Sequence, residues 1–308
     1  MSDHIRLAVV GLGKIAQDQH LPAIARARDF ELVAAASPVG TAPGVPHFPS
    51  LEALLASGIA FDGAILCQPP QFRFSDAAMA LQAGKHVLLE KPPGASVLEG
   101  EQLLQLAQQS GRTLFAAWHS RFAPAIEPAR TWLGGRTIRA VRIEWRENVR
   151  QWHPGQAWIW EPGGFGVFDP GINALSILTE LLREPLRVLQ GTLEFPSNRH
   201  TPIGAQLSLC SLSDIPIQAS FDWRQAGPPQ WSILMETDAG QLRLLDGGAA
   251  LLLDGVTRSA GEAHEYAGIY EHFSTLIRAG RSEADLAPLR LVADAFLRCR
   301  RLTVAAFD

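Results

Sequence analysis

Lys91 stands where a buried strand is expected to end. The apolar run Val87–Leu89 is followed by Glu90, Lys91 and two prolines, and short apolar runs of this kind are typical of strands in a parallel sheet. Proline cannot donate to a strand ladder, so the strand must stop before Pro92. Ligands of open α/β sheets bind at the carboxyl ends of the strands. Lys91 is therefore either a charged group at a ligand site or an ordinary surface lysine.

Asp169 and Asn173 form a second candidate pair. Asp169-Pro170 is typical of a helix start, with aspartate as the N-cap and proline in the first helical position. Asn173 follows four residues later, so both side chains face the same way on the first turn. The pair indicates either a simple helix cap or a carboxylate and an amide that orient a hydroxyl and accept its proton.

A glycine-rich segment follows the first expected strand, Ile5–Val10. Its pattern, Gly11-x-Gly13-x-x-Ala16, leads from the strand into a helix, which is the setting that a dinucleotide-binding fingerprint requires. Gly11 permits the tight turn, Gly13 lets the backbone approach a pyrophosphate, and Ala16 lets the helix pack closely. The N–H groups at the helix start would then bind the phosphates.

The second expected strand, Glu31–Ala36, ends in Ser37-Pro38 rather than in the Asp or Glu that holds the ribose of NAD. The loop over residues 38–49 also has no Lys or Arg for the 2′-phosphate of NADP. The sequence therefore leaves NAD and NADP both open. We favour NAD, because a 2′-phosphate gains little without a cationic partner.

Strands and helices alternate in the first half of the chain, which predicts an α/β Rossmann domain with a doubly wound parallel sheet over residues 1–120. The further elements expected there are strands at Asp62–Leu66, His86–Leu89 and Thr113–Ala117 and helices at Phe72–Ala83 and Val97–Gln109.

Residues 121–308 are expected to form an α+β domain for substrate binding. A helix is followed by strand after strand, which indicates an open, mainly antiparallel sheet. The open sheet offers a surface for a homo-oligomer. A terminal helix that could return to the first domain is expected at Leu289–Leu302, after the helix at Pro124–Leu133 and strands at Ile138–Glu147, Leu186–Phe195, Ala205–Leu212, Pro216–Trp223, Trp231–Thr237 and Gln241–Leu244.

Glu147 ends the apolar face of its expected strand. It is either the point at which this face leaves the core or an acceptor for a polar ligand. Trp152 and His153 follow closely in the chain. A Trp offers an apolar ring and one N–H donor, which suits the C–H face and the hydroxyls of a sugar.

Composition limits the class of protein. The 308 residues are 47% hydrophobic and 19% charged, with a net charge of −4, which suits two folded domains and argues against nucleic acid or an anionic membrane as partner. Cys67, Cys210 and Cys299 form neither a disulfide framework nor a zinc pattern. We therefore expect a cytoplasmic protein without a metal, a signal peptide or a membrane span.

These motifs together resemble the Gfo/Idh/MocA oxidoreductase family. The segments GKIAQDQHLPAI, HVLLEKPPG, WHSR, WHPGQAWIWEPGG and GVFDPGINALSI are similar, more closely, to the bacterial D-galactose / L-arabinose 1-dehydrogenases of that family. This resemblance runs essentially from end to end. It implies a Rossmann domain, a second domain with an open sheet, and hydride transfer from a sugar carbon to nicotinamide.

The resemblance also implies roles for single residues. Lys91, Asp169 and Asn173 would be catalytic, with Asn173 where many family members, but not this subgroup, have His. Some subgroup members that use NADP have Arg in place of Pro38, which agrees with NAD. The sugar would contact the three catalytic residues and His119, Glu147, Trp152, His153 and Trp231. The cofactor would contact Gly11, Gly13, Lys14, Ile15, Ser37, Cys67, Pro69, Glu90 and Lys91.

The sequence thus predicts an NAD(P)-dependent aldose 1-dehydrogenase that oxidises L-arabinose and/or D-galactose at C1 to the lactone. The base is either Lys91 or Asp169, because coupled groups titrate as a pair. Two other functions stay open: an oxidoreductase of this family that acts on another polyol or sugar, and a non-catalytic, nucleotide-sensing Rossmann protein.

Overall fold

The alternating strands and helices of the first part of the chain form a six-stranded parallel sheet. They are seen in a computed structural model of the protein, which describes residues 4–262 and 264–308. The strands lie in the order β3-β2-β1-β4-β5-β6, so the strand order reverses beside β1, where such sheets bind ligands. Their bounds are β1 Ile5–Val10, β2 Phe30–Ala36, β3 His47–Phe48, β4 Gly63–Leu66, β5 His86–Glu90 and β6 Leu114–Ala117.

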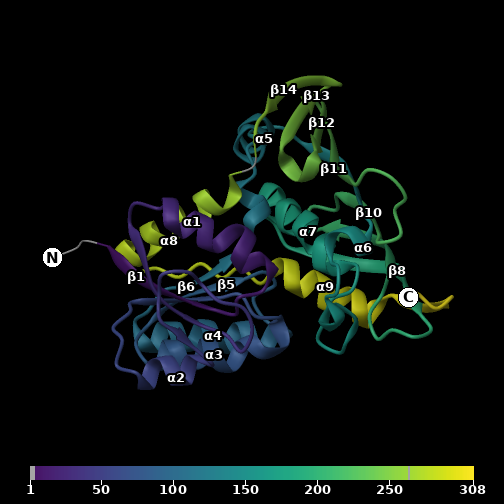
Figure 1. Cartoon of the computed structure of the whole chain (residues 1–308). Coiled ribbons are helices and arrows are strands. Elements are labelled where there is room, and N and C mark those ends of the chain that lie inside the picture. Colours follow the sequence, from purple (N-terminus) through teal and green to yellow (C-terminus); the bar gives the residue numbers. More distant parts are fainter. Residues whose placement is uncertain (1–3, 263) are drawn as a thin grey trace. The chain divides into compact units, whose positions relative to one another are not determined.

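Helices cover both faces of this sheet. Figure 1 shows α2, α3 and α4 along one face and α1 and α8 along the other. The chain enters α1 through a π-helical turn at Ala16–His20. The bounds are α1 Leu21–Arg26, α2 Leu51–Ala56, α3 Arg73–Gln82, α4 Val97–Ser110 and α8 Glu265–Ala279, with a 3-10 turn at Pro70–Phe72.

The parallel sheet belongs to a compact unit made of residues 1–119 and 266–286. The returning segment is α8 and the loop after it, whereas the sequence had suggested the terminal helix. Aromatic rings fix α8 to β2, since the ring of Phe30 lies 5.6 Å from that of Tyr270 and 5.9 Å from that of Phe273. Apolar residues recur along α8 every three or four positions, a helical signal that the sequence analysis missed.

The second unit, residues 120–265 and 287–308, is built on a nine-stranded sheet. The strand order is β14-β13-β12-β11-β7-β10-β9-β8-β15, and all neighbours are antiparallel except β7 with β10 and β8 with β15. The predicted fold class, a Rossmann domain plus a mainly antiparallel sheet domain, is confirmed. The strands are β7 Ile138–Arg146, β8 Leu186–Pro196, β9 Gly204–Ser211, β10 Pro216–Asp222, β11 Gln230–Thr237, β12 Gly240–Leu245, β13 Ala250–Leu253, β14 Val256–Ala260 and β15 Arg300–Val304.

Helices α7 (Phe168–Leu182) and α9 (Ala287–Arg298) pack on one face of this sheet. The ring of Phe168 on α7 lies 5.6 Å from that of Phe221 on β10 and 5.7 Å from that of Phe296 on α9. Two shorter helices complete the unit, α5 (Ile126–Leu133) and α6 (Val149–Trp152), with 3-10 turns at Ala157–Trp160 and Asp246–Gly248. A further 3-10 turn, His119–Phe122, begins at the last residue of the first unit.

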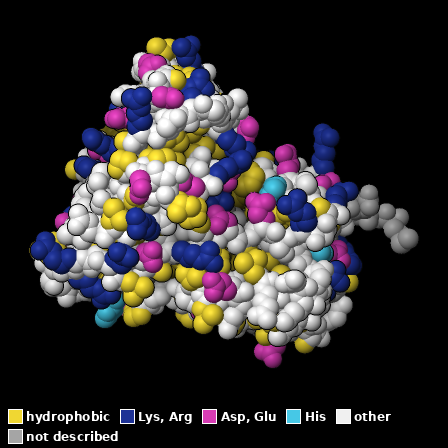
Figure 2. Space-filling view, turned by 180° about the vertical axis from the view of Figure 1, so that it is seen from behind, with side chains coloured by type: hydrophobic (Ala, Val, Ile, Leu, Met, Phe, Trp, Pro, Cys, Tyr) yellow, Lys and Arg dark blue, Asp and Glu magenta, His cyan; other side chains and the backbone are white. Residues whose placement is uncertain are grey.

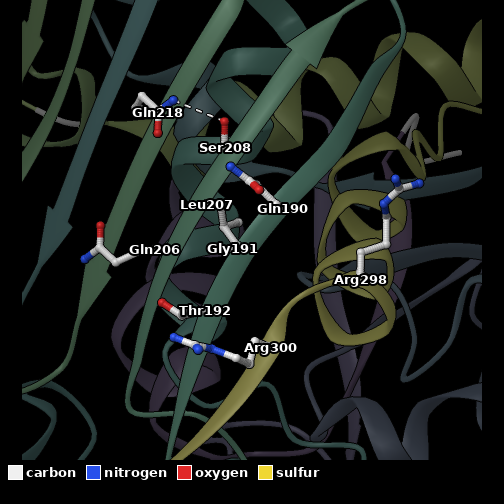
Figure 3. A pocket seen from close by; sticks show the side chains of 9 residues that line it. All are labelled: Gln190, Gly191, Thr192, Gln206, Leu207, Ser208, Gln218, Arg298 and Arg300. Carbon is white, nitrogen blue, oxygen red and sulfur yellow. Dashed lines mark hydrogen bonds between the residues drawn. The ribbon is translucent and has the colours of Figure 1, made fainter.

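The other face of the sheet carries polar side chains. Figure 3 shows a shallow hollow there, in which Gln218 donates to Ser208 over 3.1 Å. The remaining lining residues are Gln190, Gly191, Thr192, Gln206, Leu207, Arg298 and Arg300. A polar surface of this kind lies apart from the apolar core between the sheet and α7.

The expected terminal helix, Leu289–Leu302, is wrong at its carboxyl end. Helix α9 stops at Arg298, and Arg300–Val304 form the edge strand β15, which pairs in parallel with β8. The β-branched residues Thr303 and Val304 favour a strand. The edge of β8 supplies the backbone partners, and no periodicity within the segment itself could reveal that edge.

Charges of both signs are mixed on one face of the protein. On the face that Figure 2 displays, Lys and Arg side chains of the described residues are interspersed with Asp and Glu. Within residues 4–262 and 264–308, no helix has the length and apolar character needed to span a membrane. The same residues contain no group of three or more His, Cys, Asp or Glu side chains placed to hold a metal ion.

The packing of α7 on the sheet depends on Gly171. A Cβ atom at this position would lie 2.8 Å from Cδ1 of Phe221, a ring that is fully buried. Alanine favours a helix over glycine by about 1 kcal/mol, but overpacking costs about 1–3 kcal/mol. We therefore expect Gly171→Ala to lower the free energy of unfolding, measured by urea denaturation.

The matched control combines this change with Phe221→Leu, which makes room at the contact. Gly171→Ala should cost less in that background than in the wild type, because the two positions share one contact. A higher stability of Gly171→Ala alone would contradict this account of the packing.

Candidate active site

The loop after β1 has the shape that a bound pyrophosphate requires. Gly11 has a φ of +85°, and a Cβ there would lie 2.8 Å from the backbone nitrogen of Gln68. Gly13 faces open space, since no described atom lies within 4 Å of its would-be Cβ. A residue with a side chain is thus excluded at Gly11, while a ligand can approach the backbone at Gly13. Lys14 and Ile15 continue this loop into the helix.

Ser37, directly after β2, holds the loop from inside. Its hydroxyl accepts the N–H of Leu12 over 3.2 Å and donates to the carbonyl of Val39, and the residue is buried. The serine hydroxyl is therefore engaged by the protein. Pro38 and Val39, which follow it, are exposed, and this is the position from which a ribose would be contacted.

The segments after β4 and β5 lie at the same sheet edge as the glycine loop, because the strands are parallel neighbours. Cys67 is buried directly after β4, and Pro69 precedes a 3-10 turn. Lys91 follows β5 and is joined to Pro92 by a cis peptide bond. The structure thus brings the predicted cofactor residues and Lys91 together along one edge of the first unit.

Glu90, the last residue of β5, is only 2% exposed. Its Oε1 accepts the hydroxyl of Tyr266 over 2.5 Å and faces Nε2 of His20 at 3.2 Å. Burial alone would raise the pKa of Glu90, but the hydrogen bond and the positive charge of His20, with smaller effects of His119 and Tyr266, lower it to about 2. This carboxyl is therefore ionised and bound by protein groups.

His20 is the cationic partner of Glu90 and is fully buried. Burial alone would lower the pKa of His20, but Cys67, Tyr270 and Glu90 raise it well above its ordinary value. Its Nδ1 lies 2.8 Å from the hydroxyl of Tyr270. His20 and both tyrosines were not predicted as site residues, because the contact between His20 and Tyr270 spans 250 residues and leaves no local signal in the sequence.

The second unit holds another buried carboxylate, Glu147, directly after β7 and 3% exposed. Three ring nitrogens surround it: Nε1 of Trp231 at 3.0 Å, Nε2 of His153 at 3.2 Å and Nε1 of Trp223 at 3.3 Å. A carboxylate has about four lone-pair sites, so these partners leave room for one further donor. Trp223 is a residue that the sequence analysis did not single out.

His153 links Glu147 to Asp169. Its Nδ1 lies 3.6 Å from Oδ2 of Asp169 and 3.4 Å from Oε1 of Gln156. Asp169 is 4% exposed and lies in the first turn of α7, which begins one residue earlier, at Phe168. The interpretation of Asp169 as the N-cap is therefore wrong, since Val167 occupies that position. A carboxylate, an imidazole and a second carboxylate thus stand in a row.

Aromatic rings form a wall beside Glu147. The ring of Trp231 lies 5.1 Å from that of Trp152 and 6.1 Å from that of Trp145. Trp152 is 40% exposed, whereas Trp145 is buried. One exposed indole next to a bonded carboxylate is an arrangement that suits a ligand with both C–H and O–H groups.

Asn173 lies one turn after Asp169 on α7. Its side-chain oxygen is buried and has no hydrogen-bond partner among the described residues. Such an atom costs free energy unless a ligand or water satisfies it. The predicted sugar residues Glu147, Trp152, His153, Asp169, Asn173 and Trp231 all belong to the second unit, whereas Lys91 and His119 belong to the first. In the first unit, the His119 ring stacks on Tyr266 with 5.7 Å between centroids.

The lowered pKa of Glu90 has a consequence for stability. The folded state favours the ionised carboxyl, so this contribution is present above the ordinary pKa of 4.5 and is lost as the pH falls toward about 2. It amounts to about 3 kcal/mol. We expect the stability difference between the wild type and Glu90→Gln, measured by urea denaturation, to shrink over that pH range. A difference that stays constant would contradict the assignment.

Comparison with known proteins identifies the family. Residues 5–118 match the family described as oxidoreductase family, NAD-binding Rossmann fold (GFO_IDH_MocA). The chain is 47% identical over 303 residues to galactose 1-dehydrogenase of Pseudomonas fluorescens, with 98% of each chain covered.

Solved structures agree with this match. The D-galactose-1-dehydrogenase protein from Rhizobium etli has a TM-score of 0.95 and 49% identity, over 100% of this chain and 99% of that chain. A 3-ketoreductase from Actinomadura kijaniata, solved with TDP-benzene and NADP, shares the fold at a TM-score of 0.85 and 20% identity, over 98% and 99% of the two chains. The chain therefore belongs to the Gfo/Idh/MocA family of oxidoreductases, as its motifs predicted.

Proposed function

We propose that this protein oxidises a cyclic aldose, D-galactose and/or L-arabinose, at C1 to the lactone, with NAD as the favoured oxidant. The observation that carries the proposal is the similarity to galactose 1-dehydrogenases over nearly the whole chain, at 47% and 49% identity. The bonded carboxylates and exposed indole of the second unit support a substrate rich in hydroxyls. Lys91 and the glycine loop support a nicotinamide cofactor.

The glycine loop fits a dinucleotide, because Gly13 leaves open space and Gly11 packs tightly. In this proposal Gly11, Gly13, Lys14 and Ile15 hold the pyrophosphate, and Ser37, Cys67, Pro69 and Glu90 shape the rest of the binding edge. The bound nicotinamide supplies the acceptor for the hydride that leaves C1. The residues of the chain bind the sugar and handle its proton.

Asp169 is the group that we assign as proton acceptor for the C1 hydroxyl. A carboxylate at a rigid helix start can accept this proton as C1 is oxidised. Lys91 would donate a hydrogen bond to the same oxygen and stabilise the charge that develops there. Asn173 would fix the geometry, since its buried amide oxygen lacks a partner among the described residues.

The remaining hydroxyls of the sugar would be held by the cluster around Glu147. This carboxylate has room for one more donor, and His153 lies between it and Asp169. Trp152 and Trp231 would cover the apolar face of the ring. His119, beside Tyr266 in the first unit, is a further polar contact in this proposal.

The cysteines and the open sheet face bear on location and assembly. The three cysteines are free and buried, which supports a reducing compartment, and we propose the cytoplasm. The open polar face of the nine-stranded sheet is the surface that we propose for self-association. No metal enters the proposed reaction.

An assay of a panel of aldoses and polyols, each with NAD and with NADP, tests the function. The absorbance of the reduced nicotinamide reports the rate. We expect the highest kcat/KM for D-galactose or L-arabinose with NAD. A preference for another polyol would agree with the family assignment but contradict the proposed substrate. Cofactor binding without turnover on any sugar would indicate a nucleotide sensor instead.

Replacement of Asp169 or Lys91 tests the mechanism. We expect Asp169→Asn to lower kcat by about 10²–10⁴-fold and Lys91→Ala by about 10²–10³-fold, since each removes a group that acts on the reacting oxygen. The measurement is steady-state kinetics with the best sugar.

Matched controls are Asp238→Asn, which changes an exposed carboxyl that bonds Thr137, and Lys85→Ala, which removes an ammonium bonded to Phe61. Both controls should keep kcat within a few-fold of the wild type. Near-normal rates in both active-site variants would remove the proposed mechanism.

The residue after Ser37 tests the cofactor preference. Pro38 is exposed, and no Lys or Arg follows it up to residue 49. We expect Pro38→Arg to lower the KM for NADP by about tenfold, because the 2′-phosphate gains a charge-assisted bond. Pro38→Gln is the matched control without a charge and should leave the NADP preference unchanged. Equal effects of both variants would contradict the role of the charge.

A further inference from the structure

Glu90 and its partners form a closed network within the first unit. Glu90, His20 and Tyr266 are 2%, 0% and 7% exposed. Tyr266 donates to Oε1 of Glu90 over 2.5 Å, and Nε2 of His20 lies 3.2 Å from the same oxygen. An ionised carboxyl at this depth is tolerated only because it is paired and hydrogen-bonded.

The second carboxylate oxygen of Glu90 binds the neighbouring backbone. Its Oε2 accepts the N–H of Lys91 over 2.7 Å. On the other side, the buried guanidinium of Arg73 donates to the carbonyls of Glu90 and Pro92. The peptide group before Lys91 and the peptide group between Pro92 and Pro93 are therefore both held by hydrogen bonds to charged side chains.

We propose that Glu90, anchored by His20 and Tyr266, is a positioning residue that fixes the backbone from which the Lys91 side chain extends. The proposal rests on the proposed function for its catalytic consequence. The carboxylate acts through the N–H of Lys91, and a shift of about 1 Å at a catalytic group can cost about a hundredfold in rate. The role differs from direct cofactor contact, because it is exerted through the hydrogen bond from the backbone N–H of Lys91 to Oε2.

The support for Glu90 comes from a distant part of the sequence. Tyr266 and Tyr270, the two tyrosines of the chain, lie one turn apart on α8 and direct their hydroxyls to Glu90 and His20. The chain returns to the first unit at Tyr266. The hydrogen-bond network that holds the Lys91 backbone therefore includes side chains of α8, which packs against the sheet.

Tyr266→Phe tests this role, because it removes one hydroxyl and keeps the ring. Lys91 carries the one backbone N–H between Glu90 and Gly94, since the other two residues of this segment, Pro92 and Pro93, have none. Its hydrogen exchange, followed by mass spectrometry of overlapping peptides, therefore reports on the Glu90 contact. We expect exchange at Lys91 to be about tenfold faster and kcat to be about tenfold lower, with little change in the KM for NAD.

Ser274→Ala is the matched control. It also removes a buried hydroxyl from α8, but this hydroxyl donates to Asp29 over 2.5 Å. Exchange at Lys91 and kcat should stay at the wild-type level in this variant. In addition, Tyr266→Phe combined with Glu90→Gln should be no slower than Glu90→Gln alone, because Tyr266 acts through Glu90.

Each outcome decides the proposal. Unchanged exchange at Lys91 in Tyr266→Phe overturns it, and so does faster exchange with an unchanged kcat in an active enzyme. Equal effects of Ser274→Ala overturn it too, because they would indicate a general loosening of α8. Faster exchange confined to Tyr266→Phe, in a protein whose wild type oxidises no sugar, would keep the restraint on the Lys91 backbone and remove the proposed function instead.

Discussion

A buried glutamate that must be neutralised is the constraint on which both units depend. Glu90 and Glu147 each follow or end a central strand, and each is bonded to a histidine and to aromatic N–H or O–H donors. An unpaired carboxylate at this depth would cost several kcal/mol. The partners therefore have to lie in fixed positions: α8 beside the end of β5 in the first unit, and the segments that carry His153 and Trp223 beside the end of β7 in the second.

The two glutamates differ in the kind of donor that they bind. Glu90 accepts the backbone N–H of Lys91 in addition to its side-chain partners. Glu147 is surrounded by three side-chain ring nitrogens. Glu90 therefore holds the backbone beside Lys91, whereas the described contacts of Glu147 are all with aromatic side chains. Rigid strand ends suit both tasks, because a site built on regular elements loses little precision to motion.

Asp169 has a histidine beside it, and this histidine comes from another part of the chain than α7. Asn173 stands on the helix where the family resemblance allows a histidine, and an amide cannot take up a proton. His153 nevertheless approaches Asp169, with Nδ1 3.6 Å from Oδ2. An imidazole is thus available next to the carboxylate, supplied by the segment after α6 rather than by α7 itself.

The sequence by itself determined the features that depend on neighbours along the chain. The glycine loop, the strand end before Lys91, the presence of a helix at Asp169 and the parallel order of the first sheet follow from local patterns and from rules of strand connection. Only the tertiary structure decided the partners of the buried carboxylates. Tyr266 is 176 residues from Glu90 and Trp223 is 76 residues from Glu147, and no periodicity records such pairs. The same holds for β15, which became a strand because the edge of β8 was there to pair with it. Local chemistry fixes which conformation a segment favours. The free-energy cost of burying a charge or an unpaired strand edge depends instead on the partners that the tertiary structure places beside it.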